Sequence, residues 1–370
     1  MTGRARVSGH GARRPRGFGI VGAGVIGATH ADAIDSLPDA RLIAITDLEP
    51  ERTKSLAARH DCAAEPDLDG LLAREDVDVV SVCVPSGLHA EVGIRAAAAG
   101  KHLVVEKPID VSLEAADRLL GATRAAGVVM TVMAQHRFDQ GLVELRHLLD
   151  DGQLGRLVLG EASTKWYRSQ AYYDSSAWRG TWALDGGSLM NQGIHYLDLL
   201  LWSMGPVDEV TALFSTQTHE IEVEDAALAV LRFASGAVGT VVASTAVYPG
   251  FAQRLEISGT DGTAVIEDGE IVRCELSDNR ADPGPGGRTP RVSAPSPAAA
   301  NPAGLGIASH AAQLGDLLDA IDDGRPPAVT GEDGRAALAV VCAVYEAARI
   351  GRPVRLAASS DVGGQPPDSS

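Results

Sequence analysis

A glycine-rich pattern near the N-terminus has the residue types and the spacing needed to hold a dinucleotide. Gly22, Gly24 and Gly27 form a G-x-G-x-x-G motif directly after an apolar run and directly before helix-compatible sequence. Gly22 permits a tight turn, Gly24 lets the backbone approach a pyrophosphate, and Gly27 lets helix and strand pack closely. The N–H groups of the first helical turn, at Val25 and Ile26, then face the anion.

An acidic residue indicates which dinucleotide fits. Asp47 lies twenty residues after Gly27 and follows a second apolar run over 41–46. A carboxylate there accepts hydrogen bonds from a ribose diol and repels a 2′-phosphate. The sequence therefore predicts NAD rather than NADP as the cofactor. The alternative interpretation is a structural glycine turn in an α/β protein.

A lysine follows another predicted strand. The apolar run over 102–105 leads directly into Glu106 and Lys107. Because ligands of open parallel sheets bind beyond the carboxyl ends of the strands, Lys107 is aimed where a nicotinamide ring lies. The residues predicted to contact the cofactor around it are Pro85, Ser86, His89, Glu106, Lys107 and Gln135. The alternatives are a solvated lysine at 107 and a helix-start histidine with a hydrogen-bonded ring at 89.

Two further polar residues stand one helical turn apart. Asn191 and His195 are four residues apart, so on a helix they share one face. A histidine is the usual proton-transfer residue near neutral pH, and Gly186 and Gly187 let a substrate approach. His195 is therefore a candidate for proton transfer, although a core histidine at 195 is the alternative.

The segment 165–182 is dense in cations, aromatic residues and amides. Aromatic faces suit the C–H faces of sugar rings, and Lys165, Arg168 and Arg179 can pair with a phosphate or carboxylate. We therefore expect a polyol or sugar site, the alternative being a surface loop with its Trp residues packed at a domain seam. The predicted substrate-binding residues are Asn191, Lys165, Trp178, Arg179 and Arg137.

The elements that position these residues fall into two predicted domains. Strands and helices alternate over 17–136, which predicts a Rossmann-type, doubly wound parallel sheet. The region 137–357 is β-rich with hairpin turns, which predicts an open, mostly antiparallel sheet in an α+β domain. One face of that sheet needs cover from helices or another subunit. The segments expected to be disordered are 1–16, about 279–305, and 358–370.

Composition narrows the class of protein. The net charge of −17 argues against a nucleic-acid or anionic-membrane partner, and no apolar run is long enough for a membrane span. The four cysteines are scattered without metal-binding spacing, so no metal site is predicted and a cytoplasmic location fits. Arg13 and Arg14 before an apolar stretch imitate a twin-arginine signal, but cleavage there would remove the glycine motif.

Taken together, these motifs resemble the Gfo/Idh/MocA family of oxidoreductases over about 17–357. The resemblance implies hydride transfer between NAD(P) and sugars, inositols, sugar phosphates or nucleotide sugars. It also implies a second domain whose open sheet forms a homodimer or homotetramer. The residues that carry the resemblance are Gly22, Gly24, Gly27, Asp47, Glu106-Lys107-Pro108, Arg137-Phe138, Trp178-Arg179-Gly180, and Gly186-Gly187 leading to His195.

Residue by residue, the resemblance implies that Lys107 hydrogen-bonds the reacting hydroxyl and that His195 takes or returns its proton. One position departs from the pattern, because inositol dehydrogenase-like members carry Asp where this chain has Asn191. The predicted function is an NAD-dependent dehydrogenase or reductase acting on a secondary hydroxyl. The alternatives are an NAD-dependent glycosidase that oxidises its substrate transiently, and a non-catalytic NAD-binding regulator.

Overall fold

The computed structural model describes residues 14–277 and 306–356. The predicted loop 279–305 and tail 358–370 lie outside the described residues, as do positions 1–13 of the predicted extension. Within the described part, the first strand begins at Arg16, inside the predicted extension, and Arg14 pairs with Asp78.

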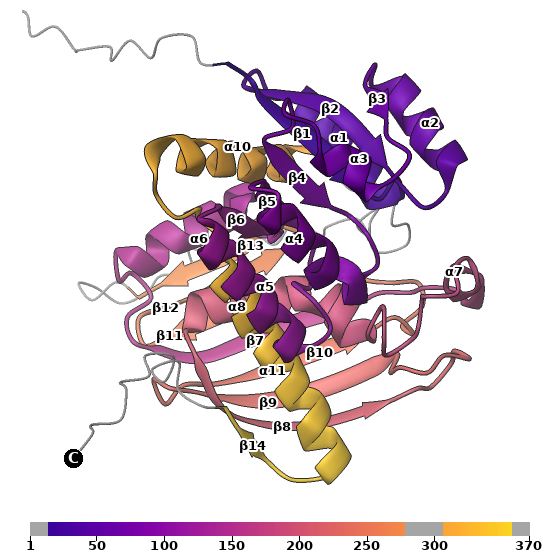
Figure 1. The fold of residues 1–370 in the computed structure, drawn as a ribbon. Helices are drawn as coiled ribbons and strands as arrows, with labels where there is room; N and C mark the ends of the chain where they lie inside the picture. Colours follow the sequence, from indigo (N-terminus) through magenta and orange to yellow (C-terminus); the bar gives the residue numbers. More distant parts are fainter. Residues whose placement is uncertain (1–13, 278–305, 357–370) are drawn as a thin grey trace, which may run out of the picture.

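The first sheet has six parallel strands in the order β3-β2-β1-β4-β5-β6 (Figure 1). The chain adds β2 and β3 on one side of β1, and then β4, β5 and β6 on its other side. At the switch point between β1 and β4, a crevice opens beyond the carboxyl ends of the strands. The strands are β1 (Arg16–Val21), β2 (Ala40–Thr46), β3 (Ala63–Ala64), β4 (Val79–Val82), β5 (His102–Val105) and β6 (Met130–Val132). The helices are α1 (Val25–Asp35), α2 (Pro50–Arg59), α3 (Leu68–Leu72), η1 (Ser86–Leu88), α4 (His89–Ala98), α5 (Leu113–Ala126) and η2 (Gln135–Phe138).

Local sequence explains these elements well. All four residues of β4 are buried, as expected of a β-branched strand covered on both faces. Helix α5 begins after Ser112, whose hydroxyl accepts from Ala115 N, and ends at Gly127 in the left-handed conformation. The predicted Rossmann-type sheet is confirmed.

The second sheet has eight strands in the order β13-β12-β11-β7-β10-β9-β8-β14. All its pairs are antiparallel except β7 with β10, so the predicted mostly antiparallel sheet is confirmed. Its strands are β7 (Leu157–Lys165), β8 (Val207–Ser215), β9 (Ala226–Phe233), β10 (Val238–Ser244), β11 (Arg254–Gly259), β12 (Gly262–Glu267), β13 (Glu270–Leu276) and β14 (Val354–Arg355). The helices that follow in this part of the chain are α6 (Gln140–Asp150), α7 (Gln170–Asp174), η3 (Leu189–Gly193), α8 (Ile194–Met204), α10 (Ala308–Asp323) and α11 (Gly331–Ile350).

Among residues 14–277 and 306–356, helices cover one face of this second sheet and leave the other open. Helices α8 and α11 pack on it and contribute to one continuous apolar core (Figure 1). Strand β9 alternates buried and exposed residues, as a sheet with one covered face requires. The other face exposes the apolar side chains Leu213, Leu228, Val230 and Val238.

Helix α10 comes after β13 of the second sheet in the sequence but packs on the first sheet. It belongs to the range 137–357 predicted for the second domain, yet it lies beside the first sheet (Figure 1). Its Leu314, Leu317 and Leu318 pack with residues of α1 and β1. The chain therefore returns to the first sheet after building the second. None of the described helices is both long and apolar enough to cross a membrane.

Candidate active site

A cavity of about 1380 Å³ lies against both domains at the carboxyl ends of β1, β4 and β5. Pockets for small ligands usually have roughly 300–1,000 Å³, so this one has room for a dinucleotide and a second molecule. Its lining contains most of the predicted site residues: Gly22, Gly24, Val25, Ile26, Asp47, Pro85, Ser86, His89, Glu106, Lys107, Gln135, Trp178, Arg179, Asn191 and His195.

The three motif glycines are needed for different reasons. Gly22 has φ +107°, and a Cβ on it would lie 2.3 Å from Cys83 O. A Cβ on Gly27 would lie 1.9 Å from Gly22 O, so this glycine is required by the packing of α1 and does not line the cavity. A Cβ on Gly24 would meet no atom within 4 Å. Gly24 is therefore not required by the protein's own packing, and it leaves open the space that a pyrophosphate would take.

Asp47 joins the end of β2 to this glycine turn. Its Oδ2 accepts from Ala23 N at 2.6 Å and its Oδ1 from Glu49 N at 2.8 Å. The carboxylate lines the cavity beside the start of α1. The residues present thus fit a dinucleotide, with backbone amides for the pyrophosphate and a carboxylate for a ribose.

Glu106 is fixed by a buried partner from α1. His30 Nε2 lies 2.8 Å from Glu106 Oε1, and His30 is fully buried. Burial alone would raise the pKa of Glu106, but the hydrogen bond and charge of His30 outweigh it and hold that pKa at about 2. The second oxygen, Oε2, accepts from Lys107 N at 3.1 Å. Glu106 therefore anchors the backbone that presents Lys107.

His89 lines the cavity but its ring also ties two strand ends together. Nδ1 lies 2.7 Å from Pro108 O and Nε2 lies 2.9 Å from Val84 O. Burial lowers its pKa. The ring is engaged by backbone carbonyls on both sides, which supports the structural interpretation of this residue.

Lys107 meets the second domain at Asn191. Its Nζ donates to Asn191 O at 2.7 Å and to Asn191 Oδ1 at 3.3 Å. The Nδ2 of Asn191 in turn donates to Asp185. Burial lowers the pKa of Lys107, while the charges of Glu106 and Asp185 oppose that effect. A predicted catalytic side chain and a predicted substrate residue are thus in direct contact.

His195 lies on the same wall of the cavity, one residue into α8. The preceding segment, η3, is a single π-helical turn that carries Asn191, a geometry frequent at functional sites. The His195 ring meets the edge of His136, with ring centroids 5.3 Å apart. Burial, followed by the charge of Lys107, holds the pKa of His195 well below its usual range. At neutral pH the imidazole is neutral and can accept a proton.

Aromatic rings and two arginines form the wall contributed by 166–179. Arg179 stacks on Tyr172 and Trp178, with its Cζ 4.2 and 4.5 Å from the ring centroids. Arg168 stacks on Trp166 at 4.8 Å. Both arginines line the cavity and both lie close enough to Lys107 to oppose its charge. This wall combines positive charge with flat apolar surface.

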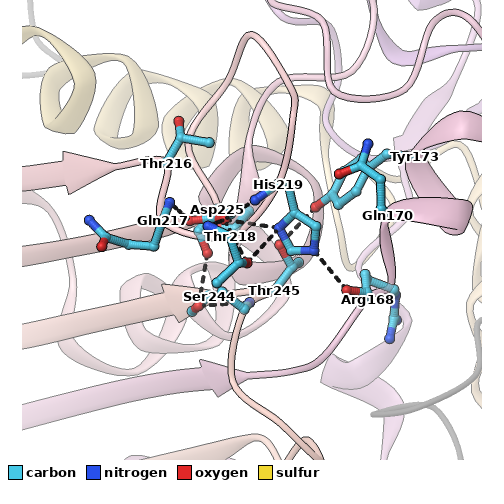
Figure 2. Close-up of polar contacts among 12 residues, drawn as sticks. Arg168, Gln170, Tyr173, Thr216, Gln217, Thr218, His219, Asp225, Ser244 and Thr245 are labelled. Atoms are coloured by element: carbon cyan, nitrogen blue, oxygen red, sulfur yellow. Dashed lines mark hydrogen bonds and ion pairs between the residues drawn. The ribbon is translucent and has the colours of Figure 1, made fainter.

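A buried polar network holds the backbone of Arg168 (Figure 2). His219 Nε2 lies 2.8 Å from Arg168 O, and His219 Nδ1 lies 2.9 Å from Asp225 Oδ2. Asp225 is fully buried and also accepts from Gln217 N and Thr218 N. The network fixes the main chain from which the Arg168 side chain leaves.

Two predicted substrate residues lie elsewhere. Arg137 is buried and makes a two-point ion pair with Asp198, at 2.8 and 2.6 Å, outside the lining of the cavity. Lys165 is exposed at the end of β7, also outside that lining. These placements favour a structural role for Arg137 and a surface position for Lys165 over the predicted contacts with substrate.

Sequence reasoning missed several residues of the cavity. Tyr172 and Gln192 stand beside predicted residues and could have been found by proximity. His310 lines the cavity with both ring nitrogens buried. No spacing pattern points to His310, because only the return of α10 to the first domain brings it there.

Comparisons with known proteins agree with this geometry. Residues 16–134 match the model of an oxidoreductase family with an NAD-binding Rossmann fold, and residues 142–265 match the GFO/IDH/MocA C-terminal domain. The chain is 28% identical to the myo-inositol 2-dehydrogenase of Thermotoga maritima, covering 92% of this chain and 98% of that one. It is 31% identical to the uncharacterized oxidoreductase YrbE of Bacillus subtilis, covering 70% and 76%.

Among solved structures, the WlbA dehydrogenase from Bordetella pertussis, in complex with NADH and UDP-GlcNAcA, is similar throughout. The TM-score is 0.82 at 31% identity, covering 94% of this chain and 99% of that one.

The glycine geometry makes a paired prediction. Gly24→Val should leave the melting temperature of the free protein near its normal value and weaken NADH binding by about tenfold or more, or roughly 1.4 kcal/mol. Gly27→Ala should instead lower the stability of the free protein, by about 1–3 kcal/mol, because its methyl group meets Gly22 O. Thermal melts and NADH fluorescence titrations measure both. Equal destabilisation by the two changes would contradict the assignment of Gly24 to the ligand.

Proposed function

The chain belongs to the GFO/IDH/MocA oxidoreductase family, and we propose that Lys107 and His195 carry out its chemistry on a secondary hydroxyl. The protein is an NAD-dependent dehydrogenase or reductase of sugars, cyclitols or nucleotide sugars. The observation that carries our assignment of the residues is their convergence. An ammonium and a neutral imidazole line the same cavity as the glycine turn.

Each residue has one task in the oxidation direction. When bound, NAD supplies the hydride acceptor for the substrate carbon. His195 accepts the hydroxyl proton, which a neutral imidazole can do. Lys107 donates a hydrogen bond to the same oxygen and stabilises its developing negative charge. The C–O bond becomes a carbonyl as the proton and the hydride leave, and reduction runs the same steps in reverse.

The charge of the cavity supports an anionic substrate. Arg168 and Arg179 present positive charge on the wall that adjoins Lys107, and Arg179 is held flat against two aromatic rings. A guanidinium suits a carboxylate or phosphate, and the aromatic faces suit a sugar ring. We therefore place sugar phosphates, nucleotide sugars and sugar acids ahead of neutral cyclitols.

The exposed face of the second sheet supports self-association. Leu213 on β8 lies directly opposite Leu228 on β9, and Val230 is the next outward residue of the same strand. Their side chains are 74%, 52% and 56% exposed. A contiguous apolar patch of this kind on a sheet marks a contact surface. We propose that it pairs with the same face of a second copy in a homodimer or homotetramer.

The catalytic assignment predicts a distinctive pH profile. For alcohol oxidation, log kcat/KM should stay level as pH falls through 6.5, because the lowered pKa keeps His195 neutral there. At high pH, log kcat/KM should begin to fall below pH 10.5, the ordinary pKa of a lysine, because burial also lowers the pKa of Lys107. NADH formation with a panel of inositols, sugar phosphates, sugar acids and nucleotide sugars identifies the substrate for this measurement.

The matching variant is Lys107→Met, which should reduce kcat by about a hundredfold or more while NADH still binds. An acid limb above pH 6.5 would contradict the lowered pKa of His195. Bound NADH without turnover of any compound in the panel would contradict the proposed reaction.

The anionic substrate is tested at Arg179. Arg179→Met should raise KM for the preferred anionic substrate by about tenfold to a hundredfold, since a lost charge-assisted hydrogen bond costs roughly 1.5–3 kcal/mol. KM for a neutral inositol should change little. Arg118→Met on the exposed face of α5 is the matched control. An equal loss with neutral and anionic substrates would argue against charge recognition.

The association surface is tested by charge. Leu228→Glu together with Val230→Glu should convert the assembly to monomers in light scattering, because four or more carboxylates would face one another. Val143→Glu on α6, at 41% exposure, is the control. A wild-type protein that is already monomeric at micromolar concentration would refute the proposal.

A further inference from the structure

We propose that Asp185 is a positioning residue that orients the Asn191 amide so that its oxygen faces Lys107. This inference rests on the proposed catalytic role of Lys107. Related enzymes of the inositol dehydrogenase type carry a carboxylate at the position of Asn191. In this chain the carboxylate is that of Asp185, which is separated from the Lys107 ammonium by the Asn191 amide. Asp185 directly precedes the Gly186-Gly187 pair in the sequence, and it does not line the cavity.

Asp185 is rigidly held just behind the cavity wall. Its side chain is buried, with 3% exposure. Oδ2 accepts from Gly180 N at 2.7 Å, and Oδ1 accepts from Asn191 Nδ2. The main chain around it is also closed, since Asp185 N and Gly186 N both donate to Thr181 O. The carboxylate therefore cannot turn away from Asn191 without breaking a buried turn.

The chemistry of a carboxylate decides which way the Asn191 amide faces. An ionised carboxylate only accepts hydrogen bonds, so the Asn191 atom next to it must be the NH₂ group. The amide oxygen is then directed to Lys107 Nζ, 3.3 Å away. In the opposite orientation an NH₂ group would face the ammonium and an oxygen would face the carboxylate, and both contacts would be repulsive.

This orientation leaves Lys107 ready for a substrate. The ammonium has three N–H groups, and two acceptors of Asn191, its O and Oδ1, take two of them. The third N–H remains for the reacting hydroxyl. A misoriented amide would lose one of these acceptors and leave the ammonium free to rotate.

The surrounding charges agree with this arrangement. Burial raises the pKa of Asp185, while the hydrogen bonds from Gly180 N and Asn191 and the charges of Arg179 and Lys107 oppose that effect. Lys107 faces Glu106, Asp185, Arg179 and Arg168, and His195 faces Lys107, His136 and His310. Loss of the Asp185 charge should therefore lower the pKa of Lys107.

The experiment moves the carboxylate from residue 185 to residue 191. Asp185→Asn should lower kcat by about tenfold or more and move the alkaline limb of kcat/KM to lower pH. In the double variant Asp185→Asn with Asn191→Asp, the new carboxylate at 191 accepts from Lys107, and the new amide at 185 donates to that carboxylate. The double variant should regain most of the lost kcat and return the alkaline limb. A purely structural role for Asp185 would show no such rescue.

A readout without turnover keeps this test independent of the proposed reaction. Modification of Lys107 by pyridoxal phosphate and borohydride, followed by peptide mass spectrometry across pH, reports the titration of its amine. Asp185→Asn should shift that midpoint to lower pH, while NADH affinity and the melting temperature confirm folding. If wild-type protein turns over no substrate but the shift appears, the proposed function fails and the positioning role stands.

The control is another buried carboxylate close in sequence to Lys107. Asp110 is 2% exposed and accepts from the backbone amides of Ala90, Val111 and Ser112. Asp110→Asn should reduce stability without moving the titration of Lys107. An unchanged Lys107 midpoint in Asp185→Asn, or a double variant no better than the single one, would overturn the inference.

Discussion

The site depends on an ammonium group that is enclosed in the wall of a cavity. Holding such a charge away from bulk water is unfavourable unless acceptors and opposite charges surround it. Lys107 reaches the cavity from β5 of the first domain, but its nearest acceptors, Asn191 O and Oδ1, come from the second. The reacting centre is therefore complete only where the two domains meet. The same requirement explains why Glu106 and Asp185 flank Lys107 from opposite domains.

Other buried polar contacts hold that junction in register. Arg137, at the end of the first sheet, grips Asp198, which lies three residues after His195 on α8. This two-point ion pair fixes the rotation of α8, which carries the His195 imidazole. Arg137 therefore helps to position His195 although it does not line the cavity. Breaking such a pair usually costs roughly 3–5 kcal/mol, because one buried charge is left without a partner. The hydrogen bond between His219 Nε2 and Arg168 O likewise fixes the main chain of Arg168 (Figure 2).

Much of the first domain was predictable because its signals are local. The glycine motif, the apolar strands and the caps of α5 lie within a few residues of the features they determine. Lys107 lines the cavity because it directly follows a parallel strand, and topology alone brings such residues to one edge of the sheet. Strand β13 has a weaker local signal, because its seven residues mix charged and apolar side chains and it pairs only with β12. Arg137 and His310 could not be placed, since the partner of one is 61 residues away and the other arrives on a helix that crosses back.

Asn191 joins the substrate argument to the positioning argument. A carboxylate in direct contact with Lys107 would lie at the cavity surface and would repel an anionic substrate. An amide there transmits orientation from Asp185 but carries no net charge itself. Because Asp185 is 3% exposed behind that amide, its charge is directed at Lys107 and Arg179 more than at the open cavity. The exchange of Asp for Asn therefore keeps the ammonium oriented and leaves the wall of Arg168, Arg179 and Lys107 electrostatically open to an acid or phosphate.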